Sequence, residues 1–194
     1  MKAKLGPDHP DTLGSMNNLA NAYRDAGRLS EALALYEETL KLRKTKLGPD
    51  HRDTLESMNN LATAYGDAGR PSEALALYEE ALKLRKTKLG PDHPATLQSM
   101  NGLAWLLATC SDSRLRDGAR GVALAEEAVA ATQRKDGYVL DTLAAAYAET
   151  GQFTKAASVE KEALALIKDP GIRNGCEARL KLYEANSPYR EPPR

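Results

Sequence analysis

The sequence predicts an all-α protein, a right-handed solenoid of antiparallel helix pairs with a C-terminal capping helix. The segment LGPDHPDTL at 5–13 recurs as LGPDHRDTL at 47–55 and as LGPDHPATL at 89–97, which is a period of 42 residues. Within each unit, apolar residues follow the spacing of one helix face twice, with a turn between the two stretches. A fixed period of this length is typical of arrays in which each repeat packs on its neighbours.

Each unit is predicted to open with a turn and a first helix. Asp8 is the expected helix cap, and Pro10 is tolerated in the first turn because the amides there have no intrahelical partner. The face of this helix that we expect to be buried carries Leu13, Met16, Leu19, Ala20 and Tyr23.

A short break then precedes the second helix. Gly27 suits the left-handed residue that ends a helix, and Ser30 suits the cap of the next one. The second helix is predicted from Ala32, Leu33, Tyr36 and Leu40. The units 5–46 and 47–88 are identical at 36 positions and differ at six, so we expect them to fold alike.

The later units vary this pattern. The third unit, 89–133, has a longer connection before its second helix, which is expected near 119–133. The fourth unit, 137–167, keeps the apolar spacing, but Glu160 stands where the second helix should carry an aromatic residue. We therefore expect the last helix pair to be partly exposed.

The chain is predicted to end with a capping helix at about 170–186 and a proline-rich tail, 187–194, that is extended or disordered. Residues 1–186 are thus predicted to form a single repeat array. Lys2–Leu5 copies the end of a repeat, Lys44–Leu47, so we expect the array to continue upstream in a longer protein.

The pattern Leu-Ala-x-x-Tyr, followed by Gly and then by Ala-x-x-x-Tyr, resembles the tetratricopeptide repeat. The Asn-Asn-Leu-Ala motif and the Leu-Gly-Pro-Asp-His-Pro loop resemble the kinesin light chain subtype, which also occurs in bacterial multidomain signalling proteins. The resemblance covers roughly residues 5–167. It implies a protein-interaction module that holds an extended peptide in a concave groove.

Composition narrows the function further. The chain has 27 Lys and Arg residues and 27 Asp and Glu residues, so it has no net charge that would favour binding to nucleic acid or to an acidic membrane surface. No apolar run approaches the roughly 18 residues of a membrane span, and no signal peptide is evident, so we expect a cytoplasmic protein. Cys110 and Cys176 are isolated in the sequence and are expected to be buried or bystander thiols.

No catalytic constellation, phosphate-binding loop or cofactor motif is present, so the sequence predicts neither an enzyme nor a cofactor site. His9, His51 and His93 occupy equivalent positions in successive repeats and are expected to serve in loops or caps rather than to bind a metal. The basic runs 41–46 and 83–88 are expected to be solvated helix ends, neutralised by acidic residues one turn earlier.

The ligand is expected on the arc of each first helix that lies opposite its apolar face. Three of the six differences between the near-identical units fall there, at Gly14/Glu56, Asn21/Thr63 and Arg24/Gly66. The predicted groove residues are Asn17, Asn18, Asn21, Arg24, Glu56, Asn59, Asn60, Thr63, Gln98, Asn101 and Trp105.

Asparagine is a poor residue for a helix interior, and its amide both donates and accepts hydrogen bonds. A ladder of Asn17, Asn59 and Asn101 could hold the backbone of an extended peptide, or the amides could brace neighbouring helices. Trp105 could be an aromatic anchor or a packing residue. A C-terminal carboxylate is not the favoured ligand, because Asn17 and Asn59 occupy the sites where its basic clamp would lie.

The main hypothesis is therefore a module that binds a peptide or a partner protein. The alternative is a structural array, natural or engineered, that associates with itself through its amino-terminal edge.

Overall fold

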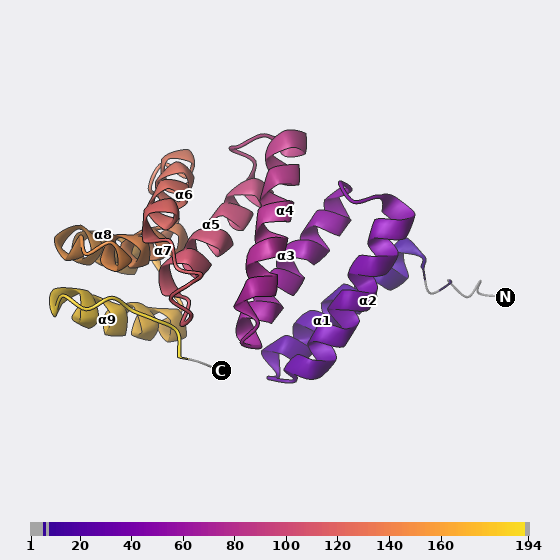
Figure 1. Cartoon of the computed structure of the whole chain (residues 1–194), viewed down its shortest axis with the longest axis horizontal. Helices are drawn as coiled ribbons and strands as arrows, with labels where there is room; N and C mark the ends of the chain where they lie inside the picture. Colours follow the sequence, from indigo (N-terminus) through magenta and orange to yellow (C-terminus); the bar gives the residue numbers. More distant parts are fainter. Residues whose placement is uncertain (1–5, 7, 193–194) are drawn as a thin grey trace. The chain divides into compact units, whose positions relative to one another are not determined.

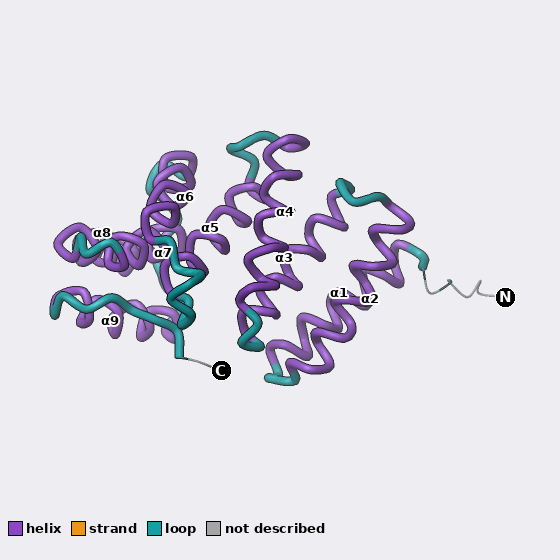
Figure 2. Tube along the Cα trace, in the orientation of Figure 1, coloured by secondary structure: helices purple, strands orange, loops and turns teal. Residues whose placement is uncertain are grey.

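The computed structural model describes residue 6 and residues 8–192, which form nine α-helices and no strand (Figure 2). This confirms the all-α prediction for the described residues. Lys2–Leu5 and the last two residues of the predicted tail lie outside them. No helix in the described part of the chain is long and apolar enough to cross a lipid bilayer.

The chain divides into two compact units, which meet in sequence between Pro91 and Asp92 (Figure 1). The first unit contains α1 (Pro10–Asp25), α2 (Leu29–Leu47), α3 (Arg52–Asp67) and α4 (Pro71–Leu89). The second unit contains α5 (Pro94–Thr109), α6 (Gly118–Ala131), α7 (Gly137–Glu149), α8 (Phe153–Leu166) and α9 (Pro170–Glu184). Within each unit, helices that are consecutive in the sequence pack against one another, as expected for helix-pair repeats.

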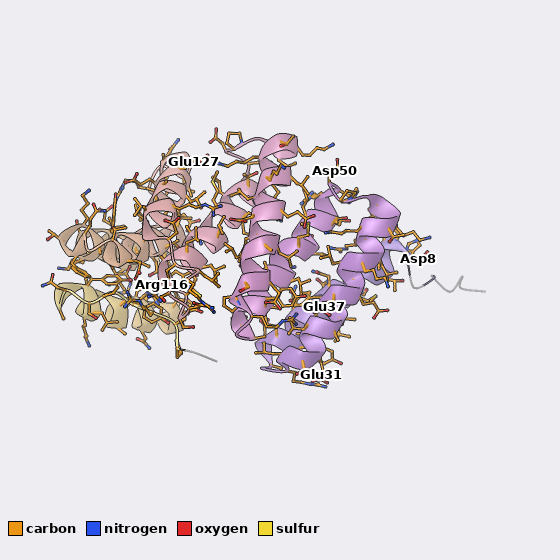
Figure 3. The ribbon with its side chains drawn as sticks, viewed as in Figure 1. Asp8, Glu31, Glu37, Asp50, Arg116 and Glu127 are labelled. Atoms are coloured by element: carbon orange, nitrogen blue, oxygen red, sulfur yellow. The ribbon has the colours of Figure 1, made fainter. Side chains whose placement is uncertain are left out.

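Histidine, rather than aspartate, caps the first helix of three repeats. The Nδ1 atoms of His9, His51 and His93 accept hydrogen bonds from backbone N–H groups two residues later, over 3.2, 3.2 and 3.1 Å. The capping role predicted for these histidines is confirmed, and the cap predicted at Asp8 is wrong. Asp8 and its counterpart Asp50 (Figure 3) instead form ion pairs with lysines near the ends of α2 and α4, Lys46 and Lys88, each at 2.5 Å.

The turn within each helix pair is as tight as the sequence suggests. Gly27 adopts φ of 73°, and its N–H donates to Arg24 O, while Arg28 N–H donates to Tyr23 O over 2.8 Å. These two bonds close the end of α1, and Arg28 is at once the N-cap of α2. The cap predicted at Ser30 is therefore wrong, because the helix has already begun when the chain reaches it.

The predicted core face of the first helix is only partly buried, because Met16 and Tyr23 are half-buried and Leu19 is exposed. Leu13 and Ala20 are fully buried, but Leu19 is 47% exposed. Its counterparts Leu61 and Leu103 are only 3% and 0% exposed. In the first unit, α2 packs against α3, the helix that carries Leu61. Helix α1 is the first helix in the described residues, so no described helix of a preceding repeat packs against it. Burial at this position therefore depends on the neighbouring helix as well as on the local sequence.

The basic ends of α2 and α4 are less solvated than predicted. Arg43 and Arg85 are buried, and each donates to backbone oxygens of α3. Arg43 Nη1 donates to Asp53 O at 2.7 Å and to Ser57 Oγ at 2.9 Å. Each basic run thus contains one arginine that bonds its helix to α3. The prediction that these runs are wholly solvated is wrong at Arg43 and Arg85.

The prediction of a partly exposed last pair is wrong at Glu160, which is completely buried. Helix α9 packs on α8 and also contacts α7, and it brings Arg179 and Tyr183 to the Glu160 carboxyl. A buried carboxyl group is tolerated where a partner charge lies beside it. Cys110 and Cys176 are both buried and free, as predicted.

Candidate functional site

The predicted groove residues lie on α1, α3 and α5, the first helices of three repeats. Those exposed are Asn18, Glu56 and Gln98, and those half-buried are Asn21, Arg24, Asn60, Thr63, Asn101 and Trp105. The remaining two, Asn17 and Asn59, are buried.

The asparagine pairs contribute to packing as well as to the surface. Asn17 is 2% exposed and Asn59 is 5% exposed. Asn60 Nδ2 donates to Asn17 Oδ1 over 3.4 Å, and this bond joins α3 to α1. The geometry favours the bracing interpretation for Asn17, whereas the neighbouring Asn18 is exposed to solvent. A peptide-binding role for the ladder therefore stays a prediction.

One position at which the near-identical repeats differ, Asn21/Thr63, holds a tyrosine of the second helix in both repeats. The hydroxyl group of Tyr36 donates to Asn21 Oδ1 in the first repeat. In the second repeat, Thr63 Oγ1 and the Tyr78 hydroxyl share a hydrogen bond of 2.8 Å. The substitution thus keeps the bond between the two helices while it changes the group on the first-helix face.

Another variable position, Arg24/Gly66, changes the charge of this face. Arg24 lies 3.3 Å from Asp25 and 4.0 Å from Asp67, so it links α1 to α3. Its counterpart in the second repeat is Gly66, which has no side chain. The first-helix face of this unit is consequently polar and mixed in charge.

A cavity of about 570 Å³, which the sequence did not indicate, opens between α2 and α4 in the first unit. Leu61 and Tyr65 of α3 also contribute to its lining, together with several charged side chains. The residues that line it are Glu37, Leu40, Lys41, Lys44, Thr45, Leu61, Tyr65, Glu73, Ala76 and Leu77. Glu37 was expected only to neutralise the basic end of its helix. In the structure its Oε1 also accepts a 2.8 Å hydrogen bond from the Tyr65 hydroxyl.

In the second unit, an extended segment of the chain itself lies on Trp105. We call Ser187–Pro192 the tail. Trp105 Nε1 donates to Glu191 Oε1 over 2.8 Å, and Glu191 N–H donates to Thr109 O over 2.8 Å. The ring of Tyr189 lies 6.0 Å from that of Trp105, centroid to centroid. The tail is therefore extended and packed on α5, within the alternatives predicted for it.

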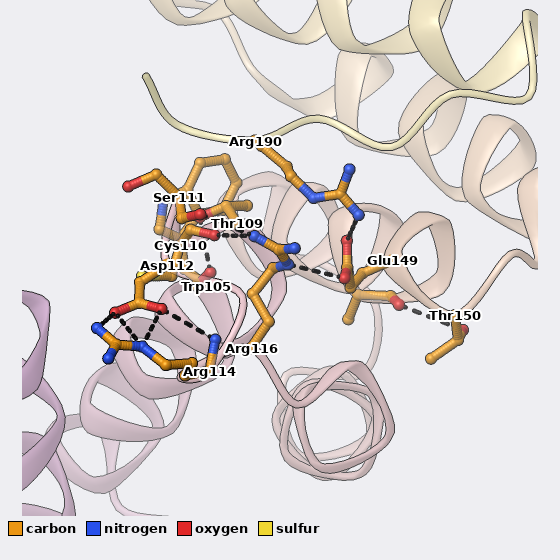
Figure 4. A network of polar contacts seen from close by, with 11 residues as sticks. Trp105, Thr109, Cys110, Ser111, Asp112, Arg114, Arg116, Glu149, Thr150 and Arg190 are labelled. Carbon is orange, nitrogen blue, oxygen red and sulfur yellow. Dashed lines mark hydrogen bonds and ion pairs between the residues drawn. The ribbon is translucent and has the colours of Figure 1, made fainter. Parts of the chain in front are cut away.

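A second contact of the tail is ionic. Arg190 Nη2 donates to Glu149 Oε2 over 2.9 Å, while the other oxygen of Glu149 accepts from Arg116 Nε over 2.9 Å (Figure 4). Arg116 also donates to the backbone oxygens of Cys110 and Ser111. Glu149 is thus held by the longer connection before α6 and presents its second oxygen to Arg190.

Arg179 of α9 completes the surface under the tail. Its guanidinium makes two 2.8 Å hydrogen bonds to the carboxylate of Asp141. It also lies over the rings of Trp105 and Tyr189, at 5.2 and 5.5 Å from their centroids. These distances are in the range of cation–π contacts. We call Trp105, Thr109, Glu149 and Arg179 the tail surface.

Next to the tail surface, three buried side chains offer possible metal ligands. The ligand atoms of Asp141, Glu160 and Cys176 lie within 4.8 Å of one another. Arg179 is bonded to Asp141, lies 3.7 Å from Glu160 and donates to Cys176 Sγ over 3.2 Å. Because Arg179 already pairs with Asp141 and donates to Cys176, we interpret the cluster as a structural polar network around one ion pair.

Sequence reasoning identified Trp105 but missed Glu149 and Arg179 of the tail surface. Glu149 and Arg179 belong to no motif, and Trp105 and Glu191 lie 86 residues apart. The composition of the tail, an aromatic and charged residues between prolines, was the one available signal, because such segments are already extended and suit recognition.

Comparison with known proteins agrees with this architecture. The tetratricopeptide repeat family matches residues 1–45 and 11–87. No curated protein matches the chain. The tetratricopeptide-repeat resemblance predicted from the repeat motifs is thus confirmed over residues 1–87.

Two of the solved structures that are similar to this one illustrate the likeness. A protein from Podosopora anserina, described as a kinesin light chain with nearly identical TPR-like repeats, is 24% identical, with a TM-score of 0.70 over 92% of this chain and 96% of that chain. BtubC (BKLC) from P. vanneervenii is 23% identical, with a TM-score of 0.66 over 98% of this chain and 70% of that chain. At these identities the likeness shows the fold.

Proposed function

We propose that this chain, which is a tetratricopeptide-repeat protein, binds an extended segment of a partner protein on the exposed faces of its first helices. Repeats of this family generally serve as protein–protein interaction modules and are typically non-catalytic. The proposed partner is a peptide or a protein rather than nucleic acid or a membrane, and the proposed setting is the cytoplasm.

The observation that carries the proposal is the tail on Trp105. An extended segment lies across a first helix with a backbone N–H bonded to a helix carbonyl and with side chains engaged on either side. These are the contacts that a peptide ligand would make. The first unit supports the proposal with a polar face whose amides, such as Asn18, are open to solvent.

The test starts from peptides selected on the intact chain from a random library. Asn18→Ala removes an exposed amide of the α1 face, and Asn174→Ala makes the same change at an exposed position of α9. A lost net hydrogen bond is worth about 0.5–1.5 kcal/mol, so Asn18→Ala should bind about two- to tenfold more weakly. Equal binding by Asn18→Ala and the Asn174→Ala control would reject the α1 face as a ligand site.

A structural array that associates with itself is the second candidate. It is favoured by the exposure of Leu19, an apolar residue whose counterparts in the later repeats are buried. The corresponding prediction is given in the Discussion.

A further inference from the structure

We propose that the tail is a built-in competitor on the tail surface, and that the partner which replaces it presents an aromatic residue followed, two positions later, by a carboxylate. This inference rests on the proposed function, since it specifies which extended segment the second unit binds and how access is controlled.

The spacing of the recognised groups follows from the extended chain. Side chains of an extended segment alternate in direction, so residues i and i+2 share one side. Tyr189 and Glu191 both contact Trp105, whereas Arg190 between them pairs with Glu149. The indole N–H of Trp105 requires an acceptor, and the guanidinium above it favours an aromatic ring or a negative charge.

The surface is held in place by contacts that do not involve the tail. Arg179 is fixed by its two hydrogen bonds to Asp141, and Glu149 is fixed by Arg116. Trp105 lies on α5, and Thr109 lies in the last turn of the same helix. A surface whose groups are already oriented binds a ligand with little further loss of conformational entropy.

The tail, by contrast, is held by contacts that a similar segment can reproduce. Arg190 is exposed, and the segment leaves α9 through Asn186, which adopts φ of 54° and redirects the chain. Pro188 and Pro192 favour the extended form before docking. Because the tail is tethered, its effective concentration at the surface is on the order of millimolar, so a free segment of the same chemistry must compete with it.

The experiment compares the full chain with a variant in which the tail is released. Tyr189→Ala with Glu191→Ala removes both groups that contact Trp105. Tyr138→Ala with Glu177→Ala makes the same two changes at exposed positions away from the tail and is the matched control. The probe is a fluorescein-labelled synthetic peptide with the sequence Ser-Pro-Tyr-Arg-Glu-Pro, and its binding is measured by anisotropy.

We expect the released variant to bind the probe at least about tenfold more tightly than the wild type and the control do. A probe with Gln in place of Glu should lose most of this binding, as should Trp105→Phe introduced into the released variant, because each weakens or removes the indole–carboxylate hydrogen bond. Trp105 is the single tryptophan of the chain, so release of the tail should also shift its emission to longer wavelength.

Equal binding of the probe by the wild type and the released variant, or an unchanged emission, would overturn the tail as competitor. If library peptides still bound the wild type in that case, the proposed function would stand without this regulation. If neither the probe nor any selected peptide bound either protein, both proposals would fail.

Discussion

Among single residues, Glu160 shows most clearly how tertiary packing overrides local sequence. Its carboxyl group faces Asp141 of α7 and Cys176, Arg179 and Tyr183 of α9. Burial, together with the negative charge of Asp141, raises the pKa of Glu160 to about 9. A hydrogen bond between the protonated Glu160 and Asp141 also favours the neutral form. The sequence could not predict this, because no spacing relates Glu160 to the α9 residues that bury it.

The raised pKa predicts a loss of stability with rising pH. The folded protein keeps a proton on Glu160 that the unfolded chain releases near the ordinary pKa of 4.5, so this contribution is complete below pH 4.5 and is lost as pH rises towards 9. The slope is at most about 1.4 kcal/mol per pH unit. In urea unfolding between pH 5 and 9, the free energy of unfolding of the wild type should fall relative to that of Glu160→Gln, because the Gln side chain does not titrate. If the free energies of unfolding of the two proteins changed in parallel with pH, the raised pKa assigned to Glu160 would be contradicted.

Tyr65 provides a second test at this scale. Its ring is 9% exposed, Arg70 lies 4.2 Å from the ring centroid, and its hydroxyl donates to Glu37. Tyr65→Ala should lower the free energy of unfolding by about 3–5 kcal/mol, as for other large buried rings. Tyr138 is 53% exposed, and Tyr138→Ala should change stability by no more than about 0.5 kcal/mol. Similar losses from the two variants in denaturant unfolding would show that burial of Tyr65 contributes little.

At the scale of elements, the turns were the most predictable feature. Gly69 adopts φ of 70° and its N–H donates to Gly66 O, which repeats the arrangement at Gly27. A glycine at this position of the sequence indicates a residue in the left-handed conformation within a tight turn. The caps were less predictable, because Asp8, His9 and Ser30 are all chemically capable of capping and the turn geometry selects among the positions.

Two glycines three positions apart should respond in opposite directions to the same change. Gly69→Ala forces a Cβ into the left-handed region and should destabilise the protein by about 1–2 kcal/mol. Gly66 lies inside α3, where an added methyl group would meet only open space, so Gly66→Ala should stabilise the helix by about 0.5–1 kcal/mol. Thermal unfolding of both variants measures the difference. A change of the melting temperature in the same direction for both would contradict this account of the turn.

The exposed edge of α1 leads to a prediction about association. If Leu19 forms part of a self-association surface, Leu19→Glu should abolish any increase of mass with concentration in sedimentation velocity, because it places a charge in the apolar contact. Leu166→Glu is the control, since Leu166 is 43% exposed on α8. Association that persists unchanged in Leu19→Glu would remove the observation on which the array hypothesis depends.

For the whole molecule, the 42-residue period predicted the order of α1 to α5, whereas α6 to α9 were expected from apolar spacing and turn residues. The candidate site was predictable only in part. Exposure of Asn18 follows from helix periodicity, but burial of Asn17 and Asn59 depends on how neighbouring repeats pack. The docked tail depends on a contact between Trp105 and Glu191 that no repeat or local pattern encodes.

The central claim is that an extended ligand lies on the first helices of the repeats. The most direct test is to photo-crosslink a library-selected peptide that carries a photoreactive phenylalanine to the intact chain and to map the modified residues by mass spectrometry. The account predicts crosslinks on the exposed faces of α1 and α3 in the first unit, at residues such as Asn18 and Glu56. Crosslinks confined to the cavity between α2 and α4, at residues such as Lys44 and Leu77, would contradict it.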